Sequence, residues 1–193
     1  MQTTSMNGIN VEALHDTVKA VQAEPEIAAF TFRAQNNWVS GGVNRTVIDG
    51  YFGACEEHTR SDPFVLVNDE PPVLLGTDTA ANPVEYVLHA LAGCITTTLI
   101  AHATARGVKI DAVETRFVGE LDVQGFLGVN PDVRNGYQSI KVNVSVKGDA
   151  DDKTLADLVQ VARNRSPVFD IVSNGVPVGM AVEVMPSQTS QAA

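Results

Sequence analysis

The chain has 193 residues, a length typical of one domain with at most a small extension. Its 13 lysines and arginines against 23 aspartates and glutamates give a net charge of −10, which excludes a nucleic-acid-binding protein. Hydrophobic residues make up 44% of the chain, enough for a sizeable core, so disorder over most of the length is also excluded. Two cysteines are too few for a disulfide scaffold or a cysteine-based zinc site, and we expect no metal and no cofactor.

Residues 1–26 are predicted to form an extension that carries an amphipathic helix, since apolar residues recur every three or four positions before Pro25. We expect this helix to dock on the main body or on a partner subunit, because its polar face lacks the cations of a membrane-surface helix. The segment also lacks the features of a secretory signal, which predicts a cytoplasmic protein. The main domain is expected over residues 27–185, followed by a flexible tail at 186–193.

Strands are predicted where apolar and polar residues alternate. The expected strands cover residues 28–39, 64–68, 113–123, 140–146 and 176–184. Gly41-Gly42 and Asp49-Gly50 are turn signals, and a second helix face runs from Leu155 to Ala162. The order of strands, long helix, strands, helix and strand predicts an α+β fold with largely antiparallel sheets.

Residues 82–106 are predicted to form the long helix. Asn82 can cap its first turn, Pro83 fits the first helical position, and Glu85 lies where a capping-box carboxylate reaches back. Residues 86–105 carry no charge, so a transmembrane span is the rival interpretation. Two histidines, four threonines and the flanking strand patterns argue against it. We therefore expect a central helix that is buried on nearly every face.

Cys94 lies in the middle of this helix. A buried mid-helix cysteine is usually inert, and it gains nothing from the positive end of the helix dipole. A reactive Cys94 would need a cation from another element of the fold to stabilise its thiolate. His89 is a poor candidate, because five helical residues place it about 140° away around the axis.

Three segments in order resemble the osmotically inducible protein C / organic hydroperoxide resistance (OsmC/Ohr) family. The first is the Gly-Gly loop from Gly41 to Thr46, and the second runs from Asn82-Pro83 through Ala90-Leu91-Ala92-Gly93-Cys94 to Val108. The third is Arg165-Ser166-Pro167-Val168-Phe169-Asp170. The resemblance implies an intertwined homodimer in which mostly antiparallel sheets wrap the two long helices.

The resemblance also implies thiol peroxidase chemistry on organic hydroperoxides. In the well-studied branch a helix cysteine attacks the peroxide, an arginine after the Gly-Gly loop holds its thiolate, and a carboxylate after Asn-Pro orients that arginine. Cys94 matches the attacking cysteine and Arg45 the arginine. Arg33 and Arg165 are left open as alternative partners of the thiol.

Two positions depart from the pattern of the family. Val84 occupies the carboxylate position. Glu85 is no simple substitute, because it lies on the helix face opposite to Cys94, and a capping role explains its presence there. Ser166 occupies the position of the resolving cysteine, and a serine before Pro167 is a good helix N-cap. Without that cysteine, an external thiol would have to reduce the sulfenic acid, as expected for a divergent one-cysteine branch of the family.

Two further segments carry alternatives. Cys55 is favoured as an ordinary loop cysteine over a resolving partner of Cys94, because neighbouring carboxylates disfavour its thiolate. The loop 124–136 carries Phe126 and Leu127 as candidate binding residues. It is interpreted either as a short helix or dimer contact, or as an apolar lid over a hydrophobic substrate.

The first functional hypothesis is a thiol peroxidase that reduces organic hydroperoxides through Cys94 in oxidative-stress defence. The alternative is a non-catalytic module that binds a small hydrophobic or acyl ligand beside Cys94. A purely structural stress protein ranks last.

Overall fold

The computed structural model describes residues 5–185, and the predicted tail at 186–193 lies outside them. The N-terminal segment contains a two-stranded hairpin, a helix and a short 3₁₀ turn: β1 (Ser5–Met6), β2 (Ile9–Asn10), α1 (Val11–Ala23) and η1 (Pro25–Ala28). The amphipathic helix ending before Pro25 is confirmed. The hairpin was not predicted, although Asn7-Gly8 is a strong hairpin signal and both residues have positive φ.

Two small antiparallel sheets follow. One has the order β4-β5-β8, with β4 (Gln35–Ser40), β5 (Val43–Ile48) and β8 (Phe64–Asn68), and the other has the order β3-β6-β7, with β3 (Thr31–Phe32), β6 (Tyr51–Gly53) and β7 (Glu56–His58). The strand at 64–68 and the turn at Gly41-Gly42 are confirmed, whereas Asp49-Gly50 forms an irregular connection between β5 and β6, which belong to different sheets. The single strand predicted over residues 28–39 is wrong. That range contains the end of η1 and two separate strands, β3 and β4, which belong to different sheets.

The long helix α2 (Pro83–Ala105) packs on the hairpin of β9 (Ile110–Glu120) and β10 (Ser139–Gly148). It follows the 3₁₀ turn η2 (Pro72–Leu74). β9 and β10 pair antiparallel over ten positions, and the alternation turns Val113, Phe117, Val142 and Val144 toward the core. β9 ends at Glu120, not at Val123 as predicted, because Asp122 caps the short helix α3 (Val123–Phe126).

Two C-terminal helices complete the core. α4 (Asp152–Arg165) buries the predicted face with Leu155, Leu158 and Ala162, and α5 (Pro167–Asn174) follows it. Leu91, Ile95 and Leu99 of α2 form the centre of the core, one helical turn apart. Each fully buried leucine contributes about 1.5–3 kcal/mol relative to exposure. The α+β class with antiparallel sheets and a long core helix is therefore confirmed.

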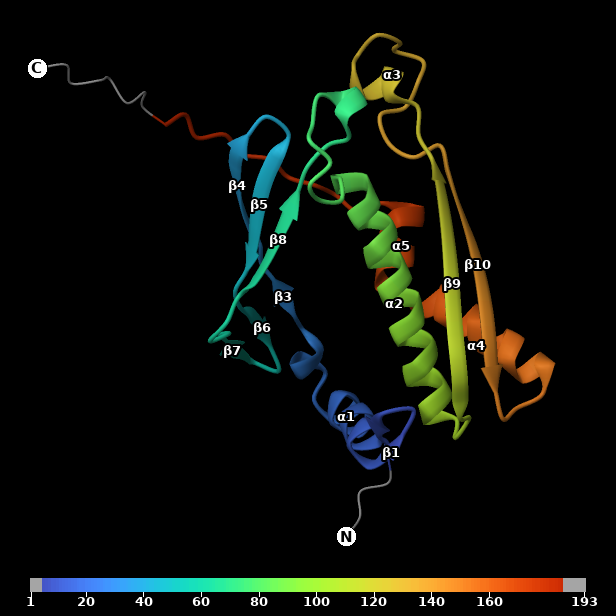
Figure 1. Ribbon diagram of the computed structural model, residues 1–193. Helices are drawn as coiled ribbons and strands as arrows, with labels where there is room; N and C mark the ends of the chain where they lie inside the picture. Colours follow the sequence, from blue (N-terminus) through green and yellow to red (C-terminus); the bar gives the residue numbers. More distant parts are fainter. Residues whose placement is uncertain (1–4, 186–193) are drawn as a thin grey trace, which may run out of the picture.

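The expectation that α2 is buried on nearly every face is wrong for the single chain. His89, Gly93 and Thr97 are exposed, and nothing lies within 4 Å of a Cβ built on Gly93. By length and hydropathy alone α2 could span a membrane, but one face packs on β9, α4 and α5 as a core helix does. Figure 1 shows the sheets that contain β4 and β6 on the other side of α2 from β9 and β10.

The strand predicted over residues 176–184 is also wrong. Within the described residues, this segment pairs with no strand, and its alternating apolar side chains are exposed, Met180 by 90%. It leaves the body after α5 and runs outward past β4 (Figure 1). An isolated extended segment has no ladder hydrogen bonds to stabilise it, which is the physical reason that the alternation alone makes no strand here.

Candidate functional site

Cys94 lies half-buried in the middle of α2 as a free thiol. Its backbone carbonyl accepts a hydrogen bond from the hydroxyl of Thr98 at 2.8 Å, so this threonine satisfies its own donor within the helix. Leu91 and Ile95, the residues three before it and one after it, are in the core. Cys94 therefore lies on a rigid, packed element, at the border between the buried stripe and the open face.

Arg45 extends from β5 and is exposed. In the antiparallel register it lies opposite Asn37 on one side and Val67 on the other. Among residues 5–185, no carboxylate forms an ion pair with Arg45, and no hydrogen bond joins it to Cys94. Within a single chain, Cys94 and Arg45 thus lie on separate elements that do not bond to one another.

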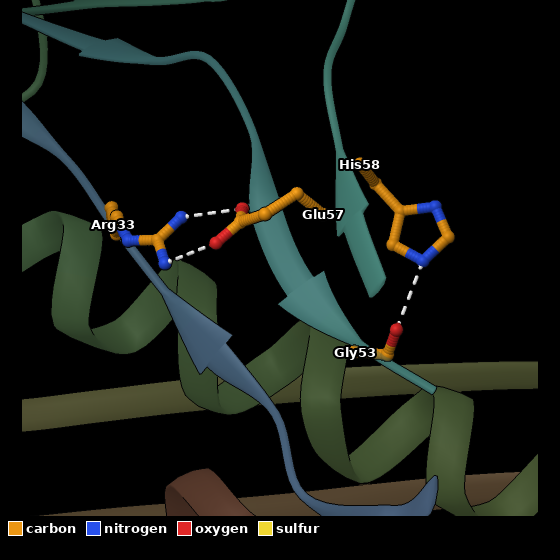
Figure 2. A network of polar contacts seen from close by, with 4 residues as sticks. All are labelled: Arg33, Gly53, Glu57 and His58. Carbon is orange, nitrogen blue, oxygen red and sulfur yellow. Dashed lines mark hydrogen bonds and ion pairs between the residues drawn. The ribbon is translucent and has the colours of Figure 1, made fainter. Parts of the chain in front are cut away.

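The two alternative arginines have other surroundings. Figure 2 shows Arg33 paired with Glu57 through two hydrogen bonds, of 2.9 and 2.8 Å. This bidentate contact raises the pKa of Arg33 and lowers that of Glu57. Arg165 lies at the end of α4, and its charge is one of the effects that lower the pKa of His102, after burial and Arg106. The guanidinium of Arg33 is therefore already engaged away from the thiol.

The capping interpretation of Glu85 is confirmed. Its carboxylate accepts a hydrogen bond from the backbone N–H of Asn82 at 2.9 Å, and the Asn82 side chain accepts one from the Glu85 N–H at 2.9 Å. Val84, at the carboxylate position of the resemblance, lines an apolar cavity. The only carboxylate in the first turn of α2, that of Glu85, is therefore engaged in capping the helix.

The capping interpretation of Ser166 is also confirmed. The serine is 2% exposed, and its hydroxyl accepts a hydrogen bond from the backbone N–H of Phe169 at 3.2 Å. Cys55 is an exposed free thiol in the turn between β6 and β7, where it and Ala54 both have positive φ. Both cysteines of the chain are free, so the favoured interpretation of Cys55 as a loop cysteine stands.

A cavity of about 550 Å³ lies between the first turn of α2, the end of β9 and the loop that precedes α2. Its walls are mainly apolar: Pro71, Val73, Leu74, Pro83, Val84, Leu121, Val123 and Phe126. Phe126 lines this cavity, as its candidate binding role requires, although its side chain is 68% exposed, whereas Leu127 does not line it. The short-helix interpretation of the loop is confirmed by α3, and its role as a lid stays a prediction.

Asp69 shapes the loop wall of this cavity, and sequence reasoning missed it. Its side chain is fully buried, and its two oxygens accept five hydrogen bonds, from the backbone N–H of Glu70, Thr77 and Thr79 and from both threonine hydroxyls, at 2.6–3.1 Å. These bonds hold the pKa of Asp69 well below its usual range. No sequence periodicity points to such a cluster, because loop contacts at +8 and +10 follow no regular element.

A second cavity, of about 410 Å³, lies beside the first between α2, β10 and α5. Val87, Leu91, Ile140 and Phe169 supply apolar walls, and Tyr137 lines both cavities. Sequence reasoning did not single out Tyr137 either. Within residues 5–185, no three His, Cys, Asp or Glu side chains gather as a metal site would require.

Comparison with known proteins decides the family. The sequence pattern of OsmC-like proteins matches residues 76–181, more than half of the chain. The chain belongs to the OsmC-like family. The predicted resemblance is thereby confirmed, and the matched range of this OsmC-like protein contains Cys94 and Ser166 but not Arg45. No curated protein matches the chain by sequence.

Solved structures share the fold of this OsmC-like protein. An OsmC-like protein from Mycoplasma pneumoniae is 13% identical with a TM-score of 0.58, over 75% of this chain and 88% of its own. An OsmC-like protein of unknown function from Vibrio cholerae is 11% identical with a TM-score of 0.57, over 74% and 94%. A structure described as an organic hydroperoxide resistance protein from Legionella pneumophila is 14% identical with a TM-score of 0.51, over 77% and 93%. At these low sequence identities, the similarity shows a shared fold.

Proposed function

We propose that this protein is a cytoplasmic one-cysteine thiol peroxidase that reduces small organic hydroperoxides through Cys94. The observation that carries the proposal is a free, half-buried thiol on the core helix of an OsmC-like fold. One similar structure is described as an organic hydroperoxide resistance protein and predicted redox protein, which supports this chemistry. The packed surroundings of Cys94 favour a fixed geometry for attack.

In the first step, the Cys94 thiolate attacks the terminal oxygen of the hydroperoxide. The S–O bond forms as the O–O bond breaks, sulfur loses two electrons, and the alkoxide leaves and takes a proton from solvent to become an alcohol. Arg45 supplies the positive charge that stabilises the thiolate and the leaving oxygen. Because Ser166 cannot form a disulfide, one external thiol displaces water from the sulfenic acid and forms a mixed disulfide with Cys94. A second external thiol attacks that disulfide, which releases the Cys94 thiol and a disulfide of the two external thiols.

A homodimer would complete this site, and two features of the chain support it. The sheets of β3–β8 expose Phe32 and Trp38 by 72% and 74%, and the apolar segment after α5 has no partner strand among the described residues. A second copy would cover both and could bring an arginine from its own β5 to Cys94.

The peroxidase proposal is tested by mass spectrometry of reduced protein mixed with one equivalent of an organic hydroperoxide and a sulfenic-acid trap. We expect a fast adduct on Cys94 that is lost in Cys94→Ser and strongly slowed in Arg45→Ala. Arg116→Ala is the matched control, because Arg116 is equally exposed but extends from β9, where it pairs with Glu114. Absence of an adduct within minutes, or equal slowing by both arginine variants, would contradict the proposal.

The second candidate function is a binding module for a small hydrophobic ligand, favoured by the 550 Å³ apolar cavity at Phe126. Cys94 lines neither this cavity nor the smaller one, so this ligand site differs from the one expected beside the thiol. We expect a neutral fluorescent hydrophobe to bind wild type and Cys94→Ser equally and Phe126→Ala more weakly. Binding that is unchanged in Phe126→Ala would place the ligand elsewhere and count against this candidate.

A further inference from the structure

The two cavities, one mainly apolar and one mixed, lie next to one another along α2 and share one side chain. The larger cavity includes Val84 of the first helical turn, and the smaller includes Val87 and Leu91 of the next two. Tyr137, which lies between α3 and β10, is a wall of both. Gly119 of the larger cavity and Ile140 of the smaller are direct partners in the β9–β10 register. The cavities are therefore neighbours separated at Tyr137.

Two contacts hold the Tyr137 ring at this position. Its hydroxyl donates a hydrogen bond to the backbone carbonyl of Val84 at 2.8 Å, which ties the side chain to the first turn of α2. Its ring lies directly against Gly119, where a built Cβ would collide with the ring. The absence of a side chain at position 119 thus makes room for the ring. Burial, followed by the charge of Glu85, raises the pKa of Tyr137, which keeps the hydroxyl a neutral donor.

We propose that Tyr137 is a specificity-determining residue whose ring divides one trough into two chambers and so limits the length of the ligand in the larger one. This inference rests on the hydrophobic-ligand function proposed above. The ligand class for the larger cavity is an uncharged, straight apolar chain, because its walls are mainly aliphatic and aromatic. The smaller cavity also has polar walls, from Arg134, Gln138, Ser139 and Ser173, which suit the hydroxyl end of such a chain. Glu70 lies at the cavity and the protein carries a net charge of −10, both of which disfavour an anionic ligand.

The test measures the affinity of the full-length protein for straight-chain 1-alkanols of six to fourteen carbons, by displacement of neutral 1-aminoanthracene. In wild type, affinity rises about fourfold with each added methylene up to the length that fills one chamber, and then stops rising. Tyr137→Ala joins the chambers, so that the rise continues to longer alcohols. Tyr137→Leu, a change less disruptive to folding, gives an intermediate limit, and Tyr137→Phe keeps the wild-type limit because the ring remains.

Tyr86→Ala is the matched control, since Tyr86 also donates its hydroxyl to a backbone carbonyl, that of Val67 at 2.9 Å, but lines neither cavity. A length limit that is the same in wild type, Tyr137→Leu and Tyr137→Ala overturns the inference, as does an equal shift in Tyr86→Ala. If no alcohol binds any variant, both the inference and the ligand-binding candidate fail. The sulfenic-acid assay at Cys94 tests the peroxidase proposal separately in every case.

Discussion

In the body formed by α2, β9, β10 and α4, apolar side chains face one another, whereas in the sheets of β3–β8 many of them face outward. Leu99 and Leu158 are fully buried, while Phe32, Trp38 and Phe64 are more than half exposed. The strands of both regions show a similar alternation of apolar and polar residues in the sequence. This alternation alone therefore does not indicate which other element, if any, packs on the apolar face of a strand. The body therefore buries its apolar side chains more fully within the single chain than the sheets of β3–β8 do.

The largest expected effect comes from opening the packed region. Leu158→Ala removes a fully buried side chain between α4 and α2, which should lower the free energy of unfolding by about 2–5 kcal/mol. Phe32→Ala, in the open region, should change the unfolding of the isolated chain by much less, because the side chain is already in solvent. Urea unfolding of both variants checks this. Equal losses would remove the distinction between the regions.

A charged side chain placed in the sheets of β3–β8 should weaken association between two chains and should not affect the folding of each chain. Phe32 stacks on Phe30 at a ring distance of 5.9 Å and lies tilted against the half-buried Tyr51 at 5.8 Å, so that Phe30 and Phe32 present an exposed aromatic surface. Phe32→Asp should weaken the proposed homodimer at least tenfold, measured by analytical ultracentrifugation over a range of concentrations. Lys147→Asp, a charge change at an exposed residue on β10, is the comparison and should leave association unchanged.

The hydrogen bonds of Asp69 to Glu70, Thr77 and Thr79 hold the loop between β8 and α2, and their contribution to stability should depend on pH. Because folding lowers the pKa of Asp69, its stabilisation is fully present above the ordinary carboxyl pKa and is lost as pH falls toward the lower folded value. Asp69→Asn should lower the melting temperature by several degrees at pH 7 and by less at pH 3. Asp157→Asn, at an exposed residue within α4, is the control for general loss of a carboxylate. A deficit independent of pH would contradict this account.

The smallest effect is expected for the exposed ion pair of Arg33 and Glu57 between β3 and β7. Both side chains are more than half exposed, so water and salt screen their attraction. A double-mutant cycle with Arg33→Gln and Glu57→Gln should give a coupling close to experimental error that disappears in 1 M NaCl. A large, salt-resistant coupling would mean that the pair is buried by something outside the single chain.

Prediction from sequence succeeded where local chemistry decides the structure. The capping box of Asn82 and Glu85, the cap at Ser166 and the alternation in β10 each depend on neighbours a few residues away. Prediction failed where the structure depends on a partner far away in the sequence. Residues 176–184 alternate as a strand does, but in the described chain no sheet edge pairs with them. For the same reason, Cys94 was identified by its place in a motif, whereas Tyr137 was found only from the cavities that it lines and Asp69 only from its buried hydrogen bonds.

The side chain of Asn7 has a consequence for the order in which the protein assembles during synthesis. It donates to the Thr104 hydroxyl and the Val108 carbonyl at 3.1 and 2.9 Å, and it accepts from the Ile110 N–H at 2.8 Å, so all three partners lie about a hundred residues downstream. On the ribosome, β1 and β2 emerge long before any of them. The β1–β2 hairpin therefore gains these contacts only after Ile110 has been synthesised, and it then links the end of α2 to the start of β9.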